Sequence, residues 1–305
     1  MPIVSDIAGK VFIAGEYGVL AGGPAVVAAI APRFVLSDDD SGGVPLGDMA
    51  HASPVGRLLG SASECGNTGF LRFRDAHFGA GGFGASTAQF ALASEALRPG
   101  LSTEAIWRSY RELHADDPVP PSGVDLFAQL QGGVQHWVGE GRSRAIQFHF
   151  ERAFEICILA AGHQSGRKVP THEHLPRLQE VAEGRAPWLP ELNALVATVA
   201  LEMESRDGHR LGAAIQSVGD LFRREGLELE ATSRDCAALG ALPQVLGIKG
   251  AGALQADALV AVVERSGVQA FVEAATRRDL RYLGTLRDYE PGIRVFHSFE
   301  AGKKG

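Results

Sequence analysis

One glycine-rich segment that runs directly into a helical pattern limits what this chain can fold into. Residues 79–88 read GAGGFGASTA, and apolar positions up to Leu97 follow at the spacing of a helix face until Pro99 and Gly100 end it. A loop of this kind leaves backbone N–H groups free at the positive end of a helix, where a polyphosphate can bind. An ordinary capped turn has the same pattern, so both interpretations stay open.

Ser86 lies at the expected start of this helix. Its hydroxyl could coordinate a phosphate-bound Mg²⁺ ion, or it could cap the helix.

Two other motifs overlap the glycine-rich segment and are less favoured. The spacing G-x-G-x-x-G would indicate a dinucleotide site, but the acid expected about 20 residues later is Glu104, in a helix-capping sequence. A nucleophile elbow, G-x-S-x-G, would need glycine at Ala88.

A second candidate segment is PPSGVD at residues 120–125, followed by Gly132 and Gly133. Its prolines and glycine predict a rigid turn that could present Asp125 to a cleft. The carboxylate could there accept the proton of a substrate hydroxyl during phosphoryl transfer. An aspartate after a turn also commonly caps a helix, and the sequence does not separate the two roles.

Two further segments carry glycine or isolated charges. Residues 9–17, GKVFIAGEY, place Lys10 and Glu16 around an apolar strand, where charges that simply face solvent are the alternative. Residues 247–253, GIKGAGA, predict a second glycine loop just before a strand. Two glycine loops far apart in the sequence could close on one ligand.

Length and charge narrow the class of protein. The 305 residues are 45% hydrophobic and 21% charged, which is enough for one large or two moderate domains. A net charge of −7 provides no basic field for nucleic acid or an anionic membrane. Cys65, Cys157 and Cys236 lack metal or disulfide spacing and are predicted to be buried thiols. We find neither a signal peptide nor a membrane-spanning run, and we expect a cytoplasmic protein.

The periodicity predicts alternating helices and strands. We place a domain boundary near residue 150, where the motif-rich half gives way to a helix-rich half, which gives domains of residues 1–150 and 151–305. Strands are expected at 11–14, 25–36, 70–73, 145–150, 154–161, 244–248, 257–263 and 293–299, and residues 37–66 are expected to be irregular. Helices are expected at 86–97, 103–114, 172–183, 190–205, 209–224, 231–240 and 266–277.

Taken in order, these segments resemble the motifs of the GHMP kinase superfamily, and within it those of mevalonate and phosphomevalonate kinases. Residues 9–30 resemble the first motif, and GFGASTA at 82–88 resembles the second, usually written GLGSSAA. PPSGVD with the later Gly-Gly resembles the segment that carries the catalytic aspartate, and residues 250–253 resemble the third motif. The resemblance covers residues 9–263.

The resemblance implies an α+β fold, with an N-terminal ATP-binding domain like domain 2 of ribosomal protein S5 and a ferredoxin-like C-terminal domain. It implies ATP and Mg²⁺ as ligands, with Asp125 and Lys10 as catalytic residues and Ser86 near the metal. The implied phosphate-binding residues are Gly81, Gly82, Gly84, Ala85, Ser86, Thr87, Gly250 and Gly252, and the implied substrate-binding residues are Glu16, Tyr17 and Ser122.

Several positions depart from the family pattern. Gly15-Glu16-Tyr17 has the form seen in phosphomevalonate kinases, whereas mevalonate kinases usually read GEH. The acidic Mg²⁺ ligand expected eleven residues before the catalytic aspartate falls on His114.

The resemblance predicts ATP-dependent phosphorylation of 5-phosphomevalonate or mevalonate, a step of isoprenoid biosynthesis. The alternative is a catalytically weakened nucleotide- or metabolite-binding protein. The expected partner is a small-molecule substrate, with no nucleic acid or membrane, and the protein is expected to be a monomer or homodimer.

Overall fold

The computed structural model describes residues 3–38, 42–61, 70–147, 153–161, 171–251 and 258–296. Its strands and α-helices follow in chain order. They are β1 (Ile3–Ala14), β2 (Ala25–Ser37), β3 (Val44–Pro45), α1 (Pro54–Ser61), β4 (Arg72–Arg74), α2 (Ala85–Leu97), α3 (Thr103–Leu113), α4 (Val124–Gln131), β5 (Val134–Gly139), β6 (Arg142–Ala145), β7 (Phe154–Ala161), α5 (Thr171–Ala182), α6 (Leu189–Glu204), α7 (Gly208–Arg224), α8 (Glu230–Gly240), β8 (Val245–Ala251), β9 (Ala258–Glu264), α9 (Val268–Thr276), β10 (Leu280–Thr285) and β11 (Arg294–Val295).

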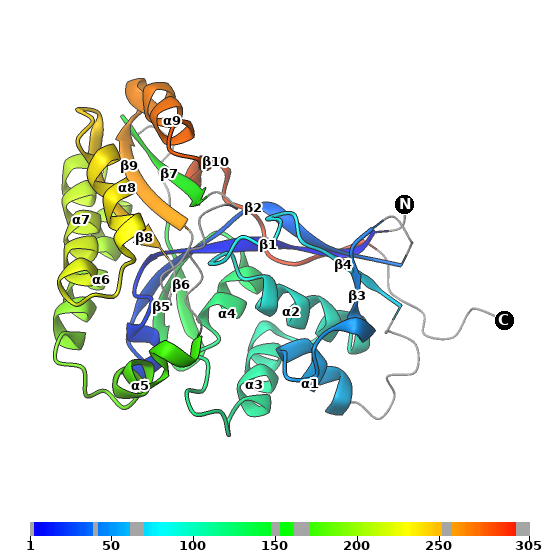
Figure 1. Cartoon of the computed structure of the whole chain (residues 1–305). Coiled ribbons are helices and arrows are strands. Elements are labelled where there is room, and N and C mark those ends of the chain that lie inside the picture. Colours follow the sequence, from blue (N-terminus) through cyan, green and yellow to red (C-terminus); the bar gives the residue numbers. More distant parts are fainter. Residues whose placement is uncertain are drawn as a thin grey trace.

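The described strands form two antiparallel sheets (Figure 1). The seven-stranded first sheet has the order β11-β1-β2-β4-β3, and β5 pairs with both β2 and β6. Helices α2 and α4 pack against β1, and α3 packs on both of them. This layer carries the glycine-rich segment and Asp125, because α2 and α4 are the helices that follow those two turns.

The four-stranded second sheet has the order β10-β7-β9-β8. Helices α5–α8 connect β7 to β8, and α9 connects β9 to β10, which is the β-α-β-β-α-β arrangement of a ferredoxin-like fold. The predicted α+β fold class is confirmed. Strands before and after residue 150 fall into different sheets, except for β11, which returns to the first sheet.

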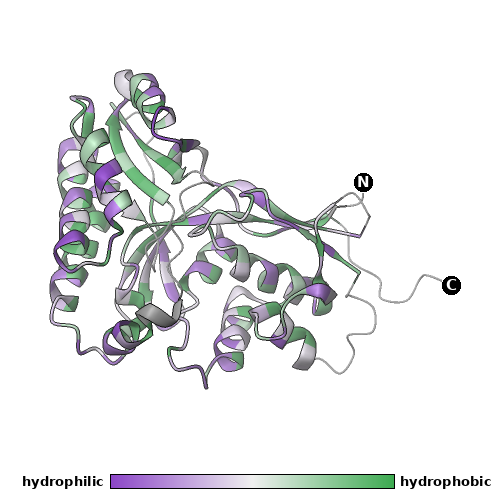
Figure 2. Cartoon of the chain, in the orientation of Figure 1, coloured by the Kyte–Doolittle hydropathy of each residue, from purple (hydrophilic) through white to green (hydrophobic). Residues whose placement is uncertain are grey.

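The central strands β7 and β9 are hydrophobic apart from Glu155 and Glu264 because helices cover both faces of the second sheet (Figure 2). Ile156, Ile158 and Val260 belong to a core that continues into the first sheet, whereas Leu159 and Leu259 join a separate cluster beneath α9. The two halves therefore share a core, and the division into two domains remains a prediction. Within the described part of the chain, no helix is long and apolar enough to cross a membrane.

The sequence pattern located most of the long elements. The helices predicted at 86–97, 190–205 and 209–224 correspond to α2, α6 and α7 within two residues. It missed α1, β3 and β10, and it did not predict the β5–β6 hairpin. These elements are short, and the two glycines of α1 weaken its helical signal. Cys157 and Cys236 are buried free thiols, as predicted, and Cys65 lies outside the described residues.

The predicted glycine loop at residues 247–253 is wrong for its first part, because residues up to Ala251 belong to strand β8. Glycine is needed there for close packing rather than for a turn. A Cβ atom on Gly250 would lie 2.7 Å from Oε1 of Glu228 and 2.7 Å from Cγ2 of Thr232. Gly252 lies outside the described residues.

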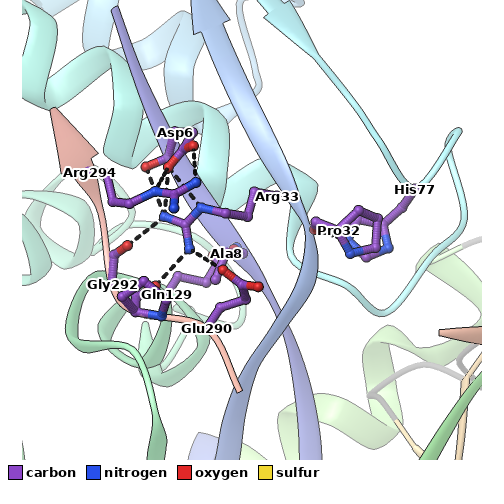
Figure 3. Close-up of polar contacts among 10 residues, drawn as sticks. Asp6, Ala8, Pro32, Arg33, His77, Gln129, Glu290, Gly292 and Arg294 are labelled. Atoms are coloured by element: carbon purple, nitrogen blue, oxygen red, sulfur yellow. Dashed lines mark hydrogen bonds and ion pairs between the residues drawn. The ribbon is translucent and has the colours of Figure 1, made fainter. Parts of the chain in front are cut away.

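The C-terminal segment crosses back to the first sheet and is held there by a buried charge cluster (Figure 3). Asp6 lies between Arg33, at 2.7 Å, and Arg294, whose Nε donates to Oδ1 at 2.8 Å. Arg33 also donates to the carbonyls of Pro291 and Gly292 at 2.8 and 2.6 Å. The segment thereby passes the C-terminal end of α4, where Gly132 bridges to Pro291.

Candidate active site

Gly84 joins the glycine-rich loop to helix α2 in a conformation that suits glycine. It is the residue before the first turn and has a φ of +84°. A Cβ atom at this position would lie 2.9 Å from Cγ of Lys10 and 3.0 Å from Nε2 of Gln129. No side chain caps the helix at Gly84, and Ser86 in its first turn is exposed. The first N–H groups of α2 are therefore available to an anionic ligand.

Gln129 ties this loop to two other elements. It is fully buried, and its Nε2 donates to the carbonyls of Ala8 and Gly84 at 2.8 and 3.2 Å. Its Oε1 accepts a 2.6 Å hydrogen bond from the hydroxyl of Thr87. Because Gln129 and Asp125 are four residues apart on α4, they lie on the same side of that helix. The network thus holds the start of α2 against the helix that carries Asp125.

Lys10 projects from β1 beside the loop, and its backbone N–H donates to the carbonyl of Phe83 at 3.0 Å. Only 6% of the residue is exposed. Its Nζ lies 4.7 Å from the ring centroid of Phe12, and within the described ranges no hydrogen bond or ion pair joins the ammonium to another side chain. Burial lowers the pKa of Lys10, whereas the negative charges of Asp125 and Glu16 oppose that shift. The site therefore holds a buried lysine in the field of two carboxylates.

Asp125 is the second residue of α4 and is half-buried. The residue that caps this helix is Gly123, so Asp125 is not the helix cap. Its carboxylate forms no hydrogen bond or ion pair with any other residue in the described segments. The preceding turn is fixed because the carbonyl of Ser122 accepts a 3.0 Å hydrogen bond from Nε1 of Trp107. A rigid turn thus presents an available carboxylate near Lys10.

The described residues bring no three His, Cys, Asp or Glu side chains together as a ready-made metal site. His114, at the position of the expected acid, is buried, and its Nδ1 lies 3.2 Å from Nη1 of Arg57 and 3.4 Å from Oδ2 of Asp117. Mg²⁺ usually binds to one or two carboxylates together with substrate phosphates. In this site Asp125 offers a carboxylate and Ser86 an exposed hydroxyl, and both are oxygen donors.

Glu16 and Tyr17 connect the turn after β1 to the second half of the chain. Oε1 of Glu16 lies 2.5 Å from Nζ of Lys249 in β8. The hydroxyl of Tyr17 donates to the carbonyl of Leu227 at 3.0 Å, and its ring meets Phe222 edge-on. These contacts join elements of the fold, and a role in substrate binding remains a prediction for both residues.

The third predicted segment, around Gly250, likewise makes hydrogen bonds within the protein. The N–H of Gly250 donates to Oε1 of Glu228 at 2.9 Å, and its carbonyl accepts from Nζ of Lys249 at 2.6 Å. Both backbone groups of Gly250 therefore have protein partners. Its predicted role in phosphate binding remains untested.

No family model matches the sequence, and no curated protein sequence matches it. Solved structures do match the fold. The mevalonate kinase of L. major in complex with R-mevalonate has a TM-score of 0.64 at 17% identity, over 92% of this chain and 95% of that one. The phosphomevalonate kinase of Streptococcus pneumoniae in complex with phosphomevalonate and AMPPNP has a TM-score of 0.68 at 12% identity, over 93% and 99% of the two chains.

The galactokinase of Lactococcus lactis in complex with galactose is also similar, with a TM-score of 0.70 at 10% identity over 96% of this chain and 95% of that one. The chain has the GHMP kinase fold. Kinases for different acceptors share this GHMP fold, so the likeness shows the fold of the chain and neither an activity nor an acceptor.

Lys10 lies next to Gly84 and within the electrostatic influence of Asp125, and the catalytic and phosphate-binding roles of these residues remain predictions. Sequence reasoning missed Gln129 and Lys249. A glutamine within an apolar stretch, four residues after Asp125, was the available sequence signal for the first. For the second it was a lysine within an otherwise apolar, glycine-rich strand.

Proposed function

We propose that this protein transfers the γ-phosphoryl group of ATP to a hydroxyl group of a small acceptor. The observation that carries the proposal is the meeting of three features at the start of α2. They are a free helix N-terminus, the buried ammonium of Lys10, and the available carboxylate of Asp125. Phosphoryl transfer depends mainly on positioning and on stabilising charge, and these groups supply both.

In the proposed reaction, the loop from Gly81 to Ser86 binds the triphosphate through backbone N–H groups, and Thr87 supports it through Gln129. Asp125 accepts the proton of the acceptor hydroxyl as the new oxygen–phosphorus bond forms. The bond between the γ-phosphorus and its bridging oxygen breaks, and ADP leaves with that oxygen. Lys10 stabilises the negative charge on the transferred group.

Magnesium fits this proposal as part of the nucleotide complex. The neighbour called MDDEF was solved in complex with MVAPP, AMPPCP and magnesium. In this chain Ser86 would hold the ion, with further ligands from the phosphates. When bound, Mg²⁺ would neutralise charge on the β- and γ-phosphates.

The first acceptors to test are 5-phosphomevalonate and mevalonate, with the former favoured by Gly15-Glu16-Tyr17. Purified protein is incubated with Mg²⁺ and ATP together with each compound, with galactose and with homoserine, and ADP release is measured. We expect turnover with one of the first two. Turnover confined to galactose or homoserine would contradict the mevalonate assignment and leave phosphoryl transfer intact.

A second function, nucleotide binding without catalysis, is favoured by His114. This residue replaces the acid expected near the metal and is engaged with Arg57 and Asp117. Calorimetry with ATP and Mg²⁺ separates the two functions. Binding without turnover of any acceptor would support the second, and measurable turnover would exclude it.

A further inference from the structure

Glu16 and Lys249 form an ion pair between the two halves of the molecule. They are 233 residues apart in sequence, and both side chains are 0% exposed. The ammonium of Lys249 also donates to the carbonyl of Gly250 and lies 5.4 Å from the ring centroid of Phe222. A buried ion pair is costly to desolvate and often adds little net stability. Its position in the fold is therefore the feature to explain.

The pair adjoins the proposed reaction site through Lys10. Alternate residues of a strand share one face, so Lys10 and Phe12 lie on the same face of β1, which continues past a register shift between Phe12 and Ala14 into the turn with Glu16. The Nζ of Lys10 lies over the ring of Phe12, in the direction of that turn. The charge of Glu16 also acts on Lys10, favouring its protonated form.

The other end of the pair is fixed to the helices of the second half. Next to Lys249, the N–H of Gly250 donates to Glu228 at 2.9 Å. Glu228 in turn accepts hydrogen bonds from Arg223 and Ser233 at 3.1 and 2.9 Å. A continuous set of contacts, part-buried at Glu228 and fully buried at Lys249, thus runs from α7 and α8 through β8 to the turn that follows β1.

We propose that Lys249 is a positioning residue of the active site, which fixes Glu16 and the turn after β1 and thereby holds the strand that carries Lys10 in place for phosphoryl transfer. The proposal rests on the proposed function. It assigns Lys249 no contact with the substrate. The ion pair makes the position of Lys10 depend on the packing of the second sheet.

Three variants of the full chain test this. Lys249→Met removes the cation, and Glu16→Gln with Lys249→Met removes both charges and leaves no uncompensated charge buried. Glu16→Lys with Lys249→Glu keeps a pair between the two halves but exchanges the positions of its two charges. We expect kcat to fall about 10²-fold in each, since small misplacements of reacting groups have effects of that size. The dissociation constant for AMPPNP, measured by calorimetry, should change less than about threefold, because the loop around Gly84 is unaltered.

If Lys249→Met fails to fold, the neutral double variant decides. Wild-type kcat in either double variant would overturn the proposal, because the pair would then serve stability alone. The control is Asp235→Asn with Arg278→Met, which removes another buried carboxylate and its partner at 2.8 Å. We expect this control to lower the melting temperature and leave kcat unchanged. Absence of turnover in the wild-type protein would overturn the proposed function and this inference together, whereas equal turnover in wild type and a double variant would overturn this inference alone.

Discussion

The hydroxyl of Thr87 lies 2.6 Å from Oε1 of Gln129, and this contact joins the first turn of α2 to the helix that carries Asp125. The other end of the same amide donates to the carbonyl of Ala8, two residues before Lys10. One buried side chain thus connects the three segments of the candidate site.

Replacing Gln129 with leucine should therefore weaken nucleotide binding as well as stability. The change takes the amide away from the carbonyl of Ala8 and from the hydroxyl of Thr87, which keeps its 3.0 Å hydrogen bond to the carbonyl of Gly84. Leaving the buried carbonyl unsatisfied costs about 1–3 kcal/mol. We expect urea unfolding to show the loss and calorimetry to show weaker binding of AMPPNP. The control is Gln135→Leu, which removes a buried amide bonded to Gly132 and Ser143, away from the loop. Equal effects of both changes on AMPPNP binding would contradict the prediction.

Asp125→Asn should abolish most of the activity without unfolding the protein. Asparagine keeps the shape but cannot take the proton of the acceptor, and loss of a positioned base typically lowers the rate about 10²- to 10⁴-fold. Since Gly123 rather than Asp125 caps α4, no capping interaction is lost. Steady-state kinetics and a melting curve check this. A wild-type kcat would end the catalytic assignment of Asp125.

Gly84→Ala should impair catalysis more than Gly79→Ala, although both glycines have positive φ, +84° and +77°. Each substitution adds a backbone cost of roughly 1–2 kcal/mol. Only at Gly84 does the new methyl group meet Lys10 and Gln129, whereas nothing lies within 4 Å at Gly79. We expect the KM for ATP to rise and kcat to fall in Gly84→Ala alone, measured at several temperatures below the melting point. Matching kinetics in the two variants would show that backbone strain is the whole effect.

His77 should make stability depend on pH between about 4 and 6.5. Burial lowers the pKa of His77 from 6.5 to about 4, against the opposing hydrogen bond to the carbonyl of Pro32 and the charge of Asp75. The unfolded chain therefore binds more protons in this interval, and the free energy of unfolding falls as the pH drops from 6.5 toward 4. The loss is up to about 3 kcal/mol, at about 1.4 kcal/mol per pKa unit.

Urea unfolding of His77→Gln across this range checks the prediction. Glutamine can still donate to Pro32 but does not titrate, so the variant should lose less stability than wild type on acidification. His209→Gln, at an exposed histidine, is the control and should follow the wild-type curve. Parallel curves for wild type and His77→Gln would contradict the assignment to His77.

Arg33→Lys should loosen the C-terminal segment from the first sheet. The guanidinium of Arg33 donates to the carboxylates of Asp6 and Glu290 and to three carbonyls, and a single ammonium cannot reproduce that fork (Figure 3). We expect faster hydrogen exchange at the N–H of Gly133, which donates to the carbonyl of Glu290. Arg57→Lys, at a half-buried arginine paired with Asp117, should leave this exchange rate unchanged. Unchanged exchange in Arg33→Lys would show that other contacts hold the segment.

The sequence by itself determined the local elements and the identity of the main candidate residues. Apolar periodicity located α2, α6, α7, β7 and β9, because each of these elements buries a face or a whole strand whose spacing is visible in the sequence. The glycine loop before α2 and the turn before Asp125 were predicted for a similar reason. Glycine and proline restrict the backbone locally, so their effect can be read without knowing what lies nearby.

The tertiary structure decided which side chains meet. Residues 247–251 form a strand because α8 and Glu228 pack directly against Gly250, and a glycine required for close packing has the same sequence signal as one in a loop. Gln129 acquired its role only when β1, α2 and α4 came together. Lys249 acquired its partner across 233 residues. Pairings of this kind depend on the path of the whole chain, whereas the pattern of a short segment records only its own backbone preference and burial.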